Sequence, residues 1–204
     1  MIVEIGRWVL EQGCSQLGAW WRQTPIALSL NVSTRELQQP DYTKAVDDAI
    51  RDPRHGPFPA SALILEITER APLEGVPGVL ESLRAVKKLG VRVALDDFGT
   101  GYCTLLNLRQ LPVDLLKIAK PFLDASGSDE RNPADLLGGI VALGKHLGLM
   151  TVAEGVERPE QQALLVKLGC DFAEGYLLGY PLDAAGAERL LTADRAQAST
   201  TARA

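Results

Sequence analysis

The sequence is poor in the residues that make cross-links and has no long apolar run. Three cysteines and two histidines occur among 204 residues. Cys14, Cys103 and Cys170 form no CxxC pair, which excludes a disulfide framework and a cysteine-rich zinc site. No apolar run approaches the ~20 residues that span a bilayer, and the first six residues lack the basic start of a signal peptide. We therefore expect a cytoplasmic protein with no membrane segment in this chain.

Positive charge is also scarce. The chain has 21 Lys and Arg against 26 Asp and Glu, which leaves a net charge of −5. This balance argues against a DNA or RNA polymer as partner, because such proteins present a broad basic face. The length suits one domain, and it is short for an eight-stranded α/β barrel of ~250 residues.

A repeated helix stop divides the chain into alternating elements. Lys-Leu-Gly occurs at 88–90 and 167–169, and His-Leu-Gly occurs at 146–148. A cation suits a helix C-terminus, and glycine can adopt the left-handed conformation that ends a helix. An apolar stretch follows each stop, and strands that alternate with helices indicate a parallel sheet. The expected strands are 26–32, 63–67, 91–95, 115–118, 149–153 and 172–178, and the expected helices are 2–22, 42–51, 76–89, 133–147 and 158–168.

Polar side chains stand where these apolar strands end. In a parallel α/β barrel the carboxyl ends of the strands lie on one face, where the active site is built. We therefore expect these side chains to converge on one pocket. They are Asn31, Glu66, Asp96, Asp97, Lys117 and Glu154. Two further glutamates follow in sequence, Glu69 three residues after Glu66 and Glu157 three residues after Glu154.

This set of side chains predicts a site for a hard divalent cation. Clustered carboxylates repel one another unless cations or protons neutralise them, and oxygen donors without His or Cys favour Mg²⁺ or Mn²⁺ over Zn²⁺. Asp96 and Asp97 could bridge two metals, as in phosphoryl displacement, and Lys117 could orient water or offset phosphate charge. In the plainer alternative, each carboxylate is a helix N-cap or a turn residue.

Several motifs resemble those of EAL domains, the cyclic di-GMP phosphodiesterases of bacterial signalling. Residues 96–102 read DDFGTGY, which is the most specific of these motifs. The others are LSLNVS at 28–33, LEITE at 65–69, LKI at 116–118, VAEGVE at 152–157 and GYLLGYP at 175–181. The resemblance implies a TIM-like (β/α) barrel over residues 1–191. Residues 192–204 are rich in Ala, Thr, Ser and Arg and lack apolar periodicity, so we expect a disordered tail there.

The resemblance also implies an activity and a role for each site residue. The activity is hydrolysis of cyclic di-GMP to linear pGpG with two Mg²⁺ or Mn²⁺ ions. Lys117 and Glu154 would be catalytic, and Glu69 would hold the loop from Asp97 to Tyr102, which couples to dimerisation in the family. The implied metal ligands are Asn31, Glu66, Asp96 and Asp97, and the implied substrate-binding residues are Glu157, Glu174, Gly175, Tyr176 and Pro181.

The chain departs from the family pattern at several places. The first two barrel strands are absent, so about six parallel strands are expected, and the absent strands carry the Glu-Ala-Leu triplet with one metal ligand. Ala119 replaces an aspartate, Glu174 replaces a glutamine and Cys103 replaces a serine. Losing a metal ligand weakens metal binding, and losing two strands exposes sheet edges.

These departures leave alternatives open. The chain is a phosphodiesterase with activity reduced or lost, or a degenerate module that binds cyclic di-GMP or a protein partner without turnover, or a fragment with a mis-assigned start. A homodimer, or a sensor or GGDEF domain in a longer parent chain, is also compatible with the resemblance.

Overall fold

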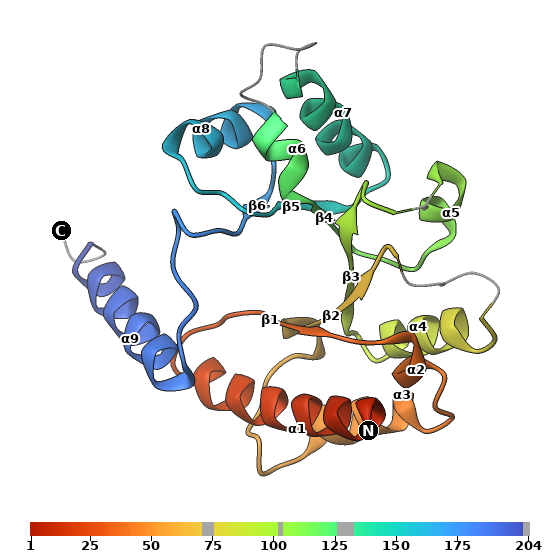
Figure 1. Ribbon diagram of the computed structural model, residues 1–204. Coiled ribbons are helices and arrows are strands. Elements are labelled where there is room, and N and C mark those ends of the chain that lie inside the picture. The colour runs from red at the N-terminus through yellow and green to blue at the C-terminus, as the bar shows by residue number, and fades with distance from the viewer. Residues whose placement is uncertain (71–75, 102–103, 126–132, 202–204) are drawn as a thin grey trace.

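A parallel sheet of six strands forms the centre of the protein. The computed structural model describes residues 1–70, 76–101, 104–125 and 133–201. Within them the strands lie side by side in chain order (Figure 1), as the sequence predicts. The strands are β1 (Leu28–Asn31), β2 (Leu63–Thr68), β3 (Arg92–Phe98), β4 (Leu115–Ile118), β5 (Met150–Ala153) and β6 (Phe172–Ala173).

The sheet curls into a half-barrel that does not close, with β1 and β6 as its edges (Figure 1). Strand β6 is shorter than the predicted 172–178 because the backbone turns at Gly175. This residue has a φ of +155°, and a Cβ there would lie 2.2 Å from the backbone nitrogen and oxygen of Val156. Only glycine fits such a close approach.

Helices connect the strands and cover the outer face of the sheet (Figure 1). The predicted helices form with small shifts, and α4 starts at Val79 because Gly78 is left-handed, with a φ of +83°. Three short helices and a 3-10 turn at Ala60–Ala62 were not predicted, since they are too short to show a helical period. The longer helix at Ala184–Thr201 was not predicted either. The helices are α1 (Ile2–Trp21), α2 (Thr34–Leu37), α3 (Tyr42–Arg51), α4 (Val79–Lys88), α5 (Leu105–Gln110), α6 (Lys120–Ala125), α7 (Pro133–His146), α8 (Pro159–Leu168) and α9 (Ala184–Thr201).

Alternation along the strands divides the side chains between two faces. In β2, Leu63, Leu65 and Ile67 pack in the main core under the helices. Ile64 belongs to a second, smaller cluster with Ala94, Leu115 and Val152. This cluster fills the floor of the concave face, below the polar strand ends.

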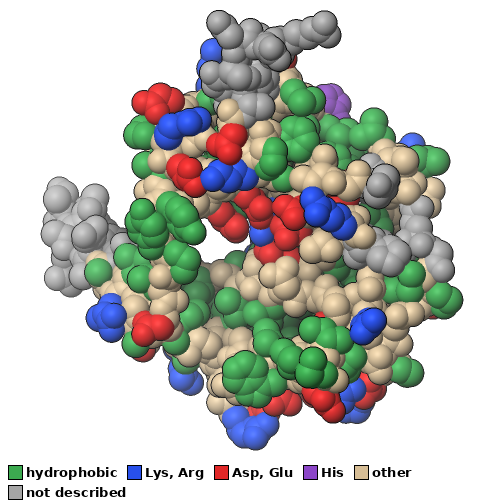
Figure 2. Space-filling view, in the orientation of Figure 1, with side chains coloured by type: hydrophobic (Ala, Val, Ile, Leu, Met, Phe, Trp, Pro, Cys, Tyr) green, Lys and Arg blue, Asp and Glu red, His purple; other side chains and the backbone are tan. Residues whose placement is uncertain are grey.

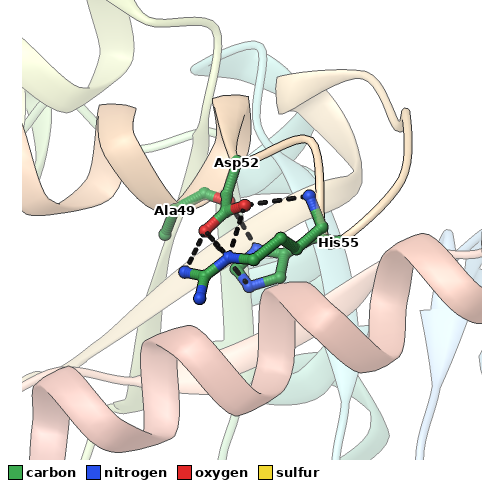
Figure 3. Close-up of polar contacts among 4 residues, drawn as sticks. Ala49, Asp52 and His55 are labelled. Carbon is green, nitrogen blue, oxygen red and sulfur yellow. Dashed lines mark hydrogen bonds and ion pairs between the residues drawn. The ribbon is translucent and has the colours of Figure 1, made fainter.

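Polar contacts fix the segment that leads from α3 into β2 (Figure 3). His55 Nδ1 donates a hydrogen bond of 2.9 Å to the carbonyl oxygen of Ala49 in the last turn of α3. Asp52 accepts hydrogen bonds of 2.9 Å from the backbone nitrogen and from Nε of Arg54. Gly18 lets α1 approach this segment, because a Cβ there would lie 1.9 Å from the carbonyl oxygen of His55.

Helix α9 enters the segment 192–204 for which the sequence predicts a disordered tail. The helix ends at Thr201, and the alanines and arginine of this segment favour helix. Its hydrogen bonds to the loop after α1 join Gln23 to Glu188 and Thr24 to Leu191, before residue 192. The behaviour of the tail in solution stays a prediction. No helix in the described ranges combines the length and apolar character of a membrane span.

The core assignment predicts a difference between two leucine-to-alanine changes. Leu65 is 1% exposed, whereas Leu106 on α5 is 66% exposed. We expect Leu65→Ala to lower the free energy of unfolding by about 2–5 kcal/mol, because it leaves a cavity under the sheet. Leu106→Ala is expected to stay within about 0.5 kcal/mol of the parent protein. Urea unfolding measures both, and equal effects would contradict this core.

Candidate active site

The polar strand ends predicted from the sequence meet on the concave face of the half-barrel. In the parallel register Asn31 pairs with Glu66, and Thr68 pairs with Asp96. Lys117 pairs with Val152, two residues before Glu154. Because side chains two residues apart share a face, Glu66, Asp96, Lys117 and Glu154 all project to the same side.

Lys117 lies at the centre of four carboxylates. Its Nζ is 3.0 Å from Glu66, 3.3 Å from Asp96, 2.6 Å from Glu154 and 3.5 Å from Glu174. Figure 2 shows acidic side chains gathered around basic atoms at the hollowed centre of this face. The structure thus brings together both predicted catalytic residues, two predicted metal ligands and one predicted substrate-binding residue.

The cluster holds Lys117 firmly in its charged form. Burial by itself lowers the pKa of the ammonium, but the carboxylates of Glu154, Glu174 and Glu66 outweigh burial and raise that pKa well above its usual range. When all four carboxylates are ionised, four negative charges face one positive charge and three negative charges remain. Such an excess in a partly buried site favours binding of a further cation.

Glu154 is the carboxylic acid of the site that titrates near neutral pH. Burial raises its pKa to about 7, the Lys117 ammonium opposes this rise, and the neighbouring Asp96 adds to it. A group with such a pKa can both accept and release a proton near neutral pH. This property suits the catalytic role that the resemblance implies for Glu154.

The two consecutive aspartates occupy different environments. Asp96 Oδ1 is buried and, among the described residues, has no hydrogen-bond partner, although Lys117 Nζ is 3.3 Å away. Asp97 has a φ of +59°, the only positive value at a described non-glycine residue. It lies where the register of β3 against β4 shifts between Leu95 and Phe98. A bulge of this kind re-aims a side chain at the end of a strand.

Glu69 binds the loop that follows Asp97. Its Oε2 accepts hydrogen bonds from the backbone nitrogens of Gly99 at 2.7 Å, Thr100 at 3.0 Å and Gly101 at 2.9 Å. Glu69 itself is 6% exposed. A buried carboxylate that accepts three N–H groups fixes a loop firmly. Tyr102, the far end of the loop predicted to depend on Glu69, and Cys103 lie outside the described residues.

The remaining predicted substrate-binding residues lie outside the Lys117 cluster. Glu157 pairs with Lys120 at 2.6 Å and is therefore separate from the Lys117 cluster. Tyr176 stacks on Tyr180 with ring centroids 4.9 Å apart, and both rings are more than half exposed. Gly175 and Pro181 flank this exposed aromatic pair in the chain, and Pro181 is exposed.

A cavity of about 240 Å³ lies on the concave face and reaches from its floor to Glu66, Lys117 and Glu174. Ser29, Arg92 and Phe172 also line this cavity, although the sequence reasoning did not single them out. The sequence could have predicted the positions of Ser29 and Phe172, because Ser29 precedes Asn31 by two residues and Phe172 precedes Glu174 by two. Residues two apart on a strand share a face.

The donor set fits a hard divalent cation. All donors are oxygens, and the buried Asp96 Oδ1 without a hydrogen bond is an atom that such a cation would satisfy. Within the described residues no three His, Cys, Asp or Glu side chains already stand in a metal-binding arrangement. The carboxylates of the site instead face the Lys117 ammonium, so binding requires them to turn partly from it.

Comparisons with known proteins agree on one family. The EAL domain family matches residues 1–181. The chain is 38% identical over 186 residues to the bifunctional diguanylate cyclase/cyclic di-GMP phosphodiesterase MucR of Pseudomonas aeruginosa, covering 90% of this chain and 27% of MucR. It is 37% identical over 185 residues to the oxygen sensor protein DosP of Escherichia coli, covering 90% of this chain and 23% of DosP. The chain therefore spans about a quarter of the length of these two relatives.

Solved structures show the same relationship. The fold matches a MucR phosphodiesterase structure in complex with c-di-GMP with a TM-score of 0.79 and 38% identity, covering 89% of this chain and 72% of that one. It matches the EAL domain of Mycobacterium smegmatis DcpA with a TM-score of 0.83 and 34% identity, covering 94% of this chain and 85% of that one. These matches confirm the TIM-like fold predicted from the sequence.

The contacts of Glu69 predict a stabilising role. We expect Glu69→Gln to lower the free energy of unfolding by about 1.5–3 kcal/mol, because the hydrogen bonds lose their charged acceptor. Hydrogen exchange of the Gly99 and Gly101 amides should accelerate in the same variant. Glu81→Gln, an exposed change on α4, serves as the control and should alter neither quantity. Unchanged exchange at Gly99 would contradict the prediction.

The raised pKa of Glu154 predicts a pH-dependent stability. Between its usual value of 4.5 and its folded value of about 7, the folded protein holds a proton on Glu154 that the unfolded chain releases. The resulting stabilisation is full below pH 4.5 and is lost as the pH rises through 7. Melting temperatures of the parent protein and of Glu154→Gln in chelator measure it. The parent should lose stability relative to the variant from pH 5 to pH 8, and a constant difference would refute the shift.

Proposed function

The chain belongs to the EAL domain family, and on that premise we propose that it hydrolyses cyclic di-GMP to linear pGpG with Mg²⁺ or Mn²⁺. MucR bears the name of a cyclic di-GMP phosphodiesterase, and one structure of MucR is a complex with c-di-GMP. The observation in this chain that best supports the proposal is the carboxylate cluster around Lys117 at the strand ends. A cation-neutralised cluster of this kind suits a substrate with two phosphates.

The cations would be held by residues of three adjacent strands. Glu66 and Asp96 supply carboxylates of the cluster, and Asn31 and Asp97 stand beside them in register and sequence. A divalent ion bound here lowers the pKa of water and neutralises charge on the phosphate. Two ions are expected, as the resemblance implies.

The protein side chains would then position the water and the scissile phosphate. Lys117 stays protonated through its carboxylate neighbours, so it offers a fixed positive charge to the phosphate. Glu154, with a pKa of about 7, accepts a proton from the attacking water. The water oxygen forms a bond to phosphorus as one ester P–O bond breaks, and the leaving ribose oxygen takes up a proton. One phosphodiester is thereby opened, which gives the linear dinucleotide.

The guanine bases would be bound by Tyr176, Tyr180 and Glu157. The stacked pair of Tyr176 and Tyr180 exposes aromatic surface, on which a purine can stack. Glu157 is a hydrogen-bond acceptor beside Lys120. Gly175 allows the tight backbone turn that brings Tyr176 next to the strand ends.

A second candidate function is binding of cyclic di-GMP or a protein partner without turnover. It is favoured by Ala119, which is 1% exposed and stands where the resemblance expects an aspartate. A methyl group there removes one carboxylate from the neighbourhood of Lys117. Homodimerisation, or attachment to a sensor or GGDEF domain in a longer parent chain, is a further proposal for either function.

The first proposal predicts a sharp loss on changing Asp96. The purified chain with Mn²⁺ and cyclic di-GMP should release pGpG, and Asp96→Asn should reduce the rate about 100-fold or more, because removing a charged ligand costs several kcal/mol in the transition state. Asp48→Asn, an exposed change on α3, is the matched control and should keep the parent rate. Chromatography of the nucleotides measures all three proteins.

Two results would decide against hydrolysis at this site. Turnover unaffected by Asp96→Asn would refute the site, and tight binding of cyclic di-GMP by the parent protein with no pGpG formed would favour the non-catalytic alternative. Calorimetric titration with cyclic di-GMP supplies that second measurement.

A further inference from the structure

Glu174 differs from the other carboxylates around Lys117 in its exposure. Its side chain is 55% exposed, whereas those of Glu66, Asp96 and Glu154 are 7%, 16% and 22% exposed. It is also the most distant of the four from Lys117 Nζ, at 3.5 Å. Glu174 therefore makes the weakest ion pair with the ammonium, and its side chain is the one of the four that can most easily reorient.

The backbone that carries Glu174 is nevertheless fixed. Its nitrogen donates a hydrogen bond of 2.8 Å to the carbonyl oxygen of Ala153, and its carbonyl oxygen accepts one of 2.9 Å from Val156. Gly175 then packs against Val156 without room for a Cβ. An exposed carboxylate on a fixed backbone in the lining of the cavity can turn toward a bound ion without moving the strand.

The charges around Lys117 also bear on the role of Glu174. Glu66, Asp96 and Glu154 already exceed the single charge of Lys117, and the next lysine, Lys120, pairs with Glu157. A fourth carboxylate in this place is repelled by its neighbours unless another cation joins the site. An amide of the same size would avoid that repulsion but would also lose the ion pair with Lys117 at 3.5 Å. A further cation would turn this balance in favour of the charged side chain.

We propose that Glu174 is a cation-binding residue that ligates the divalent ion together with Glu66 and Asp96. This inference rests on the proposed function and deepens it, since it adds an oxygen ligand from the residue that follows the edge strand β6. The ion thereby joins side chains from the centre of the sheet to its open edge. The role concerns the ion itself and is independent of nucleotide.

Calorimetric titration of the full chain with Mn²⁺ alone tests the proposal. Glu174→Gln should raise the Kd for Mn²⁺ about tenfold or more, in the range typical of supporting groups at metal sites. Glu160→Gln removes the same charge from an exposed position in the first turn of α8, and it should leave the Kd within about twofold of the parent value. Equal Kd values for the parent and Glu174→Gln would overturn the proposal, and so would equal weakening by Glu160→Gln.

A second variant separates ligation from charge. Glu174→Asp keeps the charge but withdraws the carboxylate by one methylene, so it should also weaken Mn²⁺ binding. A Glu174→Asp variant that binds Mn²⁺ as tightly as the parent would overturn direct ligation. Thermal melts in chelator check the fold, and Glu174→Gln should melt close to the parent temperature, because the relieved repulsion is offset by the lost ion pair with Lys117.

The outcome is separable from that of the proposed function. If Mn²⁺ binding depends on Glu174 but no pGpG is formed, the hydrolytic function fails and the ligand assignment stands. If pGpG is formed while Glu174→Gln binds Mn²⁺ like the parent, the ligand assignment fails and the function stands. A parent protein that binds no Mn²⁺ would overturn the assignment.

Discussion

The ammonium of Lys117, enclosed by carboxylates from four other strand ends, is the interaction on which the arrangement of the site depends. It exists only because the strands run parallel, so that Glu66, Asp96 and Glu154 project from the same face of the sheet, although Asp96 lies two residues beyond the partner of Glu66 and Glu154 two beyond the partner of Lys117. Burying such a cluster carries a large desolvation cost, which the mutual attraction offsets only if the geometry is well held. The hydrophobic layer under the helices supplies that rigidity, because Leu65, Leu95 and Leu116 on the opposite faces of the same strands are almost fully buried.

The site residues on the central strands are held more rigidly than those at the two edges of the sheet. Glu66, Asp96 and Lys117 stand on the central strands β2, β3 and β4, each of which is paired on both sides. Asn31 and Glu174 stand on or just beyond the edge strands β1 and β6 and are exposed. Side chains at the edges can therefore follow a ligand, while those at the centre keep the position of the charges. Glu69 extends the rigid part into a loop by binding Gly99 and Gly101.

Much of this arrangement could be predicted from the sequence because it follows local rules. The glycines that end the helices at 88–90 and 146–148 predict the alternation of helices and strands, and hence the parallel sheet. The polar residues at the ends of the apolar strands predict the members of the cluster. Other features depend on tertiary contacts that no local pattern carries. The bulge that sets Asp97 in a left-handed conformation needs the neighbouring strand β4, and the early end of β6 needs the close contact of Gly175 with Val156. The central place of Lys117, and the approach of Glu174 to it, follow from the curl of the whole sheet.

The proposed substrate carries phosphates, and the site carries an excess of acidic residues. Together these charges bear on the order in which cations and nucleotide would bind. Three carboxylates in excess over Lys117 repel a dinucleotide that carries two phosphate charges. Since Lys117 is already engaged by its neighbours, its single charge cannot overcome that repulsion for the whole cluster. Under the proposed function, cations would therefore enter with or before the nucleotide, and their charge would both neutralise the carboxylates and attract the phosphates. Some of the acidic residues that make the chain net negative are thus the same strand-end residues that would bind the cations of the proposed reaction.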